Sequence, residues 1–183
     1  KYDALADSLV INQKCIRNQQ LDVSLARRQS KPISDEKLVR TGDVLINSTG
    51  VGTLGRVAQV LTDLGNCTVD THVSIVRPKV GCDIDWFGLS LLAKQTHFES
   101  EGVGATGQTE LSRGRIAETL MLVPLEEMQR SFGDQVRSMR LLTLALQNKV
   151  KNLRQTRDLL LPRLMSGELD VSKLVEDEVI EET

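Results

Sequence analysis

Three glycines, Gly50, Gly52 and Gly55, spell G-x-G-x-x-G directly after an apolar run. That spacing brings backbone N–H groups close to the pyrophosphate of a dinucleotide when a helix opens at the glycines. Here the next residues include β-branched Val57 and Val60, which are typical of a strand. The acidic residue expected about 20 positions further on, at the end of a second strand, is also missing. The pattern therefore favours a strand–turn–strand element with polar side chains on its turn over the alternative, a nucleotide-binding enzyme.

Other patterns of catalytic residues are missing from the chain. It has no Asn-Pro-Pro-aromatic motif for amino-methyl transfer, no P-loop Gly-Lys-Ser/Thr and no carboxylate–lysine cluster of the nuclease type. His72 and His97 are more typical of surface or packing residues than of catalytic bases. Asp83 and Asp85 stand at an expected helix start, where capping explains them. We therefore expect a non-catalytic protein with no catalytic residue, no cofactor and no metal site.

Composition predicts an aliphatic core in a cytoplasmic protein. The chain has 183 residues, of which 40% are hydrophobic and only 3% aromatic. Cys15, Cys67 and Cys82 are widely spaced and odd in number, which favours free thiols in a reducing compartment. We expect no membrane partner, because no apolar run approaches the roughly 18–20 residues that a span needs, and no signal-peptide pattern is present. The chain begins at Lys1 and not at a methionine. Both a fragment of a longer protein and a natural protein that corresponds to half of a larger subunit therefore stay open.

Charge is unevenly distributed along the chain. The net charge of −2 divides into −5 for residues 170–183 and +3 for residues 1–169. An acidic terminal run is typical of a solvated, disordered end, so we expect residues 168–183 to form a disordered tail. The rest is mildly basic, which permits DNA binding without arguing strongly for it.

Two regions follow from the periodicity, and together they predict an α+β fold. Residues 1–124 are expected to form a mixed, β-rich globular domain, and residues 125–167 a long helix. Within the domain, Asp85–His97 predicts a helix with Trp86, Leu89, Leu92 and Ala93 on one face. Ser112–Ala117 predicts a short helix capped by Ser112. The expected strands are Val44–Asn47, Arg56–Leu61, Val73–Arg77 and Leu120–Val123.

The segment after Pro124 predicts one helix from Glu126 to Met165, about 60 Å long at 1.5 Å per residue. Proline and two acids mark its start, Ser166–Gly167 marks its end, and Pro162 is expected to kink or fray the last turn. A domain of ~120 residues is about 30 Å across and cannot cover such a helix. Its apolar stripe is therefore expected to pair with a second helix as a coiled coil, although a helix folded back on its own domain stays open. The apolar residues recur at three- and four-residue steps: Met128, Phe132, Val136, Met139, Leu142, Leu146, Val150, Leu153, Leu160 and Leu164.

Three stretches of the chain resemble a known family. They are GDVLINSTGVGTLGRVAQV over residues 42–60, ATGQTELSRGRIAETLMLVPLEEMQ over residues 105–129 and RDLLLPRLMSGELDV over residues 157–171. In this order, with a long helix joining the last two, they resemble the C-terminal half of the specificity subunit of Type I restriction–modification systems. The resemblance covers the middle and the end of the chain.

That resemblance implies a function in DNA recognition. Such a subunit has two target recognition domains, each followed by a long helix, and the two helices pair as a ruler between two DNA half-sites. The helices dock the modification subunits, which carry the methyltransferase, and the restriction subunit joins that assembly. The present chain has only one such unit. The implied partners are therefore double-stranded DNA, the modification and restriction subunits, and either a second specificity half or another copy of this chain.

Side chains able to present donors and acceptors to base edges gather in four polar stretches. Polar loops are usually just solvated, so an ordinary surface loop stays open for each of them. A further basic patch, Arg27, Arg28 and Lys31, could hold phosphates or be an ordinary exposed charge run. The candidate DNA-binding residues are Asn12, Gln13, Lys14, Arg17 and Asn18 in the first stretch, Ser48, Thr49, Thr53 and Arg56 in the second, Thr71 and His72 in the third, and Thr106, Gln108, Thr109 and Arg113 in the fourth.

Two hypotheses therefore remain beside the disfavoured nucleotide-binding enzyme. The first is a sequence-specific recognition module that reads half of a bipartite target and docks its partner subunits through the helix. The second is a scaffold that binds modification subunits by helix pairing without reading DNA. The amino-acid sequence alone does not determine which DNA sequence is recognised, because the choice of bases depends on loop geometry.

Overall fold

The computed structural model describes residues 6–104 and 109–169. The chain divides into two compact units, residues 1–135 and residues 136–183. The first unit holds all the strands and short helices of the described residues, and the second holds most of one long helix. The α+β class expected from the sequence is confirmed.

Three small sheets form the β part of the first unit. The first contains β4 (Arg27–Gln29), β1 (Ser8–Ile11) and β7 (Cys67–Val69), in that order. The second is the hairpin of β2 (Ile16–Arg17) and β3 (Gln20–Leu21). The third, which we call the central sheet, contains β6 (Val57–Gln59), β5 (Val44–Asn47) and β8 (Val73–Val76). Three single 3₁₀ turns, η1 (Gln13–Cys15), η2 (Val23–Leu25) and η3 (Asp35–Lys37), connect the N-terminal strands.

The central strand β5 is antiparallel to both of its neighbours, with Leu45 opposite Ala58 of β6 and Ile75 of β8. All four residues of β5 are buried, because its two faces contact two different cores. Leu45 packs into a core with residues of β1 and β7, whereas Val44 and Ile46 pack into a second core. Burial on both faces explains why the strand reads as a continuous apolar run rather than an alternating one.

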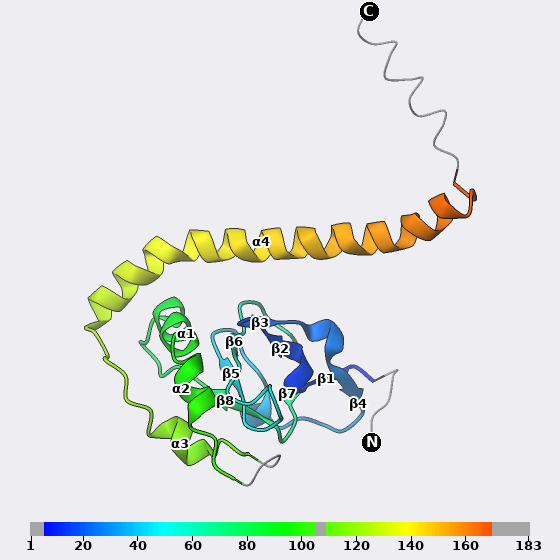
Figure 1. Ribbon diagram of the computed structural model, residues 1–183. Coiled ribbons are helices and arrows are strands. Elements are labelled where there is room, and N and C mark those ends of the chain that lie inside the picture. Colours follow the sequence, from blue (N-terminus) through cyan, green and yellow to red (C-terminus); the bar gives the residue numbers. More distant parts are fainter. Residues whose placement is uncertain (1–5, 105–108, 170–183) are drawn as a thin grey trace, which may run out of the picture. The chain divides into compact units, whose positions relative to one another are not determined.

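Three short helices cover one flank of the strands, and β1 and β4 lie on the other (Figure 1). These helices are α1 (Ile84–Leu92), α2 (Gln95–Ser100) and α3 (Arg113–Ala117). They contribute Leu91, Phe98 and Ile116 to the second core. The capping roles expected from the sequence are confirmed for two residues. Asp83 accepts hydrogen bonds from the N–H groups of Asp85 and Trp86, and Ser112 accepts one from Arg115.

Two sequence predictions about the elements are wrong. Asp85–His97 is not one helix, because the chain turns at Ala93–Lys94, and Ala93 is exposed. That turn places Gln95 Oε1 3.3 Å from the N–H of Val57 and leaves Phe98 fully buried. Leu120–Val123 is not a strand, because no strand among the described residues pairs with it. Only its Met121 packs against a core, and Leu120, Leu122 and Val123 are exposed.

The remaining strand and turn predictions are confirmed with small differences at the ends. β5 has the expected bounds, whereas β6 and β8 are shorter than the runs Arg56–Leu61 and Val73–Arg77. The glycine-rich segment 50–55 is the turn between antiparallel β5 and β6, so no helix opens at its glycines. This geometry removes the basis for a dinucleotide-binding turn.

The long helix α4 (Glu126–Met165) has the bounds that the sequence predicts. It continues through Pro162 to Met165, so of the two effects predicted there, a kink or fraying, the fraying is not seen. Gly167 follows with φ +74° and donates its N–H to the carbonyl of Leu164, which ends the helix as expected. None of the described helices combines the length and apolar character that a bilayer crossing requires.

The first turns of α4 belong to the globular unit and contact the start of α1. The N–H of Asp83 donates to Oε1 of Gln129, and Nε2 of Gln129 donates to the carbonyl of Pro124 at 2.8 Å. A Cβ at Gly133 would overlap the Asp83 carboxylate, so this close approach requires glycine at a helical position. Glycine inside a helix costs roughly 1 kcal/mol relative to alanine, and the contact accounts for its presence there.

Candidate nucleic-acid interface

Three of the four polar stretches meet at one end of the central sheet, where β5 ends and β8 begins. Thr49 connects them. Its Oγ1 accepts a hydrogen bond from Gln13 Nε2 at 2.8 Å and lies 2.8 Å from His72 Nδ1. Thr53 lies on the same side, with its hydroxyl 3.4 Å from Gln13 Oε1. We call Gln13, Thr49, Thr53 and His72 the polar cluster.

The backbone beneath the polar cluster is fixed by Asn47, the last residue of β5. Its side chain is fully buried, and its Nδ2 donates to the carbonyls of Gln13 at 3.2 Å and of Thr53 at 3.0 Å. These bonds join the first polar stretch to the glycine-rich turn. Its Oδ1 is buried without a hydrogen-bond partner in the described part of the chain. Such an orphaned acceptor is uncommon in a folded core.

Gly50 makes room for the side chains of the cluster. A Cβ at this position would lie 2.6 Å from Gln13 Oε1 and would overlap the Thr53 hydroxyl. Its φ of +108° is also one that residues with a side chain rarely adopt. The first glycine of the G-x-G-x-x-G pattern therefore serves a close approach between a turn and the Gln13 amide.

Charged groups of both signs border the cluster. Asp70 Oδ1 accepts the N–H of His72, and Glu110 forms an isolated β-bridge with Thr49. Lys14 is exposed beside Gln13, and the Arg56 guanidinium donates to the carbonyl of Gly52 at 2.6 Å within the turn. The surface thus offers hydroxyl, amide and imidazole groups between cations and carboxylates, a mixture suited to hydrogen bonding more than to simple charge attraction.

Two predicted DNA-binding residues are tied into the fold. Asn12 is buried, and its side chain caps η1 and donates to the carbonyl of Leu25. Ser48 is buried, and its hydroxyl lies 2.6 Å from that of Ser74. Both side chains are hydrogen-bonded to neighbouring segments, so each contributes to the fold, and its predicted role in DNA binding stays a prediction.

Other predicted residues are exposed without being members of the polar cluster. Arg17 and Asn18 belong to the β2–β3 hairpin, whose tip is hydrogen-bonded to the end of α1 through Gln19 and Leu92. Thr71 and Thr109 are exposed beside His72 and Glu110, and Arg113 is exposed at the start of α3. Thr106 and Gln108 lie outside the described residues, as do residues 170–183 of the acidic tail.

The basic patch lies on an edge strand of the first sheet. Arg27 and Arg28 lie on β4, and Lys31 is exposed just after it. The Arg28 guanidinium donates to the carbonyl of Ala6 at 2.9 Å, so part of this charge stabilises the sheet edge. The patch is therefore only partly available to a ligand.

The stripe of α4 is largely exposed. Met139, Leu142, Leu146 and Leu153 have exposed fractions between 53% and 62%, and Leu160 has 37%. Val136 is half-buried, while Phe132, Val150 and Leu164 are exposed. Leu141, Leu159 and Leu161 add exposed apolar surface that the three- and four-residue pattern left out. A single helix has no means of burying such a stripe by itself.

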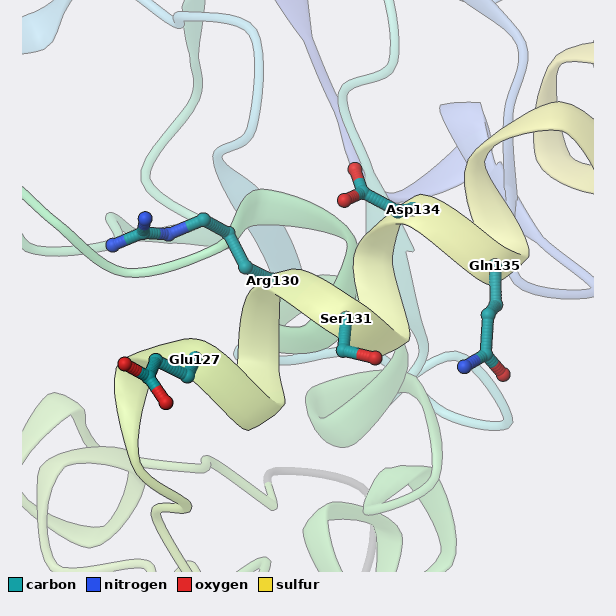
Figure 2. Close-up of a pocket in the computed structure, with 5 residues that line it drawn as sticks. All are labelled: Glu127, Arg130, Ser131, Asp134 and Gln135. Atoms are coloured by element: carbon teal, nitrogen blue, oxygen red, sulfur yellow. The ribbon is translucent and has the colours of Figure 1, made fainter.

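One open hollow of about 530 Å³ lies along the first turns of α4. Figure 2 shows that its five lining side chains, Glu127, Arg130, Ser131, Asp134 and Gln135, project from one helix in different directions rather than toward one point. A hollow of this kind has no convergent polar groups to hold a small ligand. Residues 6–104 and 109–169 also contain no group of three or more metal-binding side chains.

The sequence did not single out Asn47, which organises the polar cluster. An asparagine that closes the buried run Val44–Ile46 was a usable signal, because a buried polar side chain needs hydrogen-bond partners. No protein-family model matches the chain, and its comparison with curated proteins gives no match.

Proposed function

We propose that the chain is a sequence-specific DNA-recognition module of a Type I restriction–modification complex. Its globular unit reads one half of a bipartite target in double-stranded DNA. Its long helix pairs with that of a second specificity half, or of another copy of this chain, and docks the modification and restriction subunits. It acts in the cytoplasm without catalytic residues or a cofactor of its own, since its partners carry the chemistry.

The convergence of three polar stretches in the polar cluster carries this proposal. Gln13, Thr49 and His72 are separated by 36 and 23 positions in the chain, yet their side chains are joined by hydrogen bonds of 2.8 Å. Hydroxyl and amide groups are among those that read base edges in the major groove, and an imidazole supplies a further donor or acceptor. Because hydrogen bonds already hold these groups beside one end of the central sheet, less side-chain freedom is lost on binding.

The exposed stripe of α4 supports the second half of the proposal. A helix of 40 residues with apolar side chains repeating to its far end is suited to coiled-coil pairing. It also supports the rival function, a scaffold that binds modification subunits without reading DNA. The two differ in what the polar cluster does, because the scaffold has no use for it.

A comparison of genomic DNA methylation tests the proposal. The gene is deleted while the partner subunits stay intact, and modified sequence motifs are mapped in both strains. We expect one bipartite motif to disappear on deletion and to return when the gene is restored. Retention of every motif in the deletion strain would refute the proposal. Direct binding to duplex DNA should weaken as salt rises, because phosphate contacts release counterions.

A further inference from the structure

The Gln13 side chain is held in place from three sides. Its Nε2 donates to Thr49 Oγ1, its Oε1 lies within 3.4 Å of the Thr53 hydroxyl, and the backbone of Gly50 lies close behind the amide. Asn47 fixes the Gln13 main chain through its carbonyl. A glutamine side chain normally has several rotamers to lose on binding, and here most of that loss has already occurred on folding.

The fixed amide keeps one N–H and one lone pair without a partner in the described part of the chain. Nε2 has two N–H bonds and uses one for Thr49, and Oε1 has two lone pairs and uses one for Thr53. A donor and an acceptor side by side on one planar amide match adenine, which presents its N6 amino group and N7 in the major groove. Bidentate pairing of glutamine with adenine uses this geometry.

We propose that Gln13 reads an adenine in the half-site recognised by this chain, which rests on the function proposed above. Thr49 and Thr53 act as positioning residues that orient the amide. Gly50 is required because any side chain there would displace the amide. Gln13 would thus select one A·T base pair of the target.

Selection of duplexes from a random pool tests this inference with the full chain at low salt, where phosphate contacts are strongest. We expect the wild-type chain to select a motif with one position fixed as A·T. A good bidentate contact favours the right base pair over the others by roughly tenfold or more. In Gln13→Ala that position should lose its preference for A·T, while the other positions of the motif stay fixed. In Gln13→Glu the position should change to C·G, because a carboxylate accepts from cytosine N4.

Two further variants separate recognition from folding. Gln20→Ala removes an exposed glutamine from β3 and should leave the selected motif unchanged. Thr49→Val keeps Gln13 but removes the hydroxyl that holds its amide, so the same A·T position should relax. An unchanged motif in both Gln13→Ala and Thr49→Val would overturn the role of Gln13 while leaving DNA recognition intact. Failure of the wild-type chain to select any motif would instead count against the proposed function itself.

Discussion

Strand β5 and helix α4 both carry dense apolar sequences, but the two sets of side chains end in opposite environments. All four residues of β5 are buried between two cores, whereas most of the apolar stripe of α4 is exposed. The strand is covered by strands and helices of the same chain. The helix is too long for a domain of this size to cover. An apolar pattern therefore indicates a face that is buried in the functional protein. Whether the covering residues belong to the same chain or to a partner depends on the rest of the sequence.

The same substitution in the two regions should separate them most strongly. Leu45→Asp places a carboxylate among the fully buried residues of β5, and we expect a loss of more than about 4 kcal/mol of stability or no folded domain. Thermal unfolding followed by circular dichroism measures it. A folded domain with nearly wild-type stability would show that β5 is not the centre of the fold.

Leu146→Asp or Leu153→Asp should leave the globular unit folded and abolish assembly. Each places a charge on the exposed stripe that we propose pairs with another helix. Co-purification with modification subunits and the mass of the complex in solution measure the effect. Asn148→Asp is the matched control, because it adds the same charge away from the stripe. Equal assembly in all three variants would contradict pairing through this face.

Removal of the ion-pair partner of the buried Asp43 carboxylate should have the next largest effect, a loss of stability. The guanidinium of Arg77 donates to both of its oxygens at 2.7 and 2.8 Å, and this hydrogen bonding raises the pKa of Arg77. Arg77→Ala leaves Asp43 buried without its countercharge, so we expect a loss of about 3 kcal/mol in chemical denaturation. Arg77→Lys keeps the charge and should lose less. Assembly through α4 should survive if the two regions are independent.

Asn47 links the fold to the polar cluster. Asn47→Ala removes the two bonds that hold the Gln13 and Thr53 carbonyls, and we expect a loss of about 1–3 kcal/mol. Asn47→Asp should cost more, because it replaces the donor with an oxygen facing two carbonyls. Urea denaturation of both variants provides the test. A larger loss of stability in Asn47→Ala than in Asn47→Asp would mean that the Asn47 amide does not hold these carbonyls.

The smallest effect concerns pH. Burial, with a further contribution from neighbouring Cys15, raises the pKa of the Cys67 thiol from 9.0 to about 12. The folded protein therefore keeps a proton that the unfolded chain releases above pH 9.0. This contribution to stability is complete below pH 9.0 and is lost as pH rises from 9.0 to about 12, by about 1 kcal/mol at pH 10. Urea denaturation at pH 8 and 10 should show a smaller decrease for Cys67→Ala than for the wild type, and an equal decrease would contradict this assignment.

Local signals predicted the regular elements well. Apolar residues at three- and four-residue steps, a proline–acid start and a glycine stop predicted both ends of α4, and the apolar run predicted β5 at Val44–Asn47. Leu120–Val123 was predicted wrongly as a strand. A strand also needs a neighbouring strand to pair with, and the sequence of the segment itself does not specify one. The turn at Ala93–Lys94 has no proline or glycine to mark it and depends on the packing of Phe98.

The candidate site was only partly predictable. Polar residues could be found by type, but which of them converge depends on contacts between distant segments. Asn12 and Ser48 were predicted as DNA-binding residues by type, and their buried hydrogen bonds to Leu25 and Ser74 were not visible in the sequence. The pairing of β5 with β8 brings Thr49 beside His72, and Gln13 reaches Thr49 from a distant segment. Neither contact could be predicted from the sequence.

Selection of the DNA sequence is the role that we propose for the polar cluster. Its most direct test restores the deletion strain with a triple variant, Thr49→Val, Thr53→Val and His72→Ala, and maps the methylated motif. Thr62→Val is the control, an exposed threonine just beyond the other end of β6. With the triple variant folded, we predict that the motif is lost or altered, whereas the control restores it unchanged. Full restoration of the original motif by the triple variant would contradict the claim.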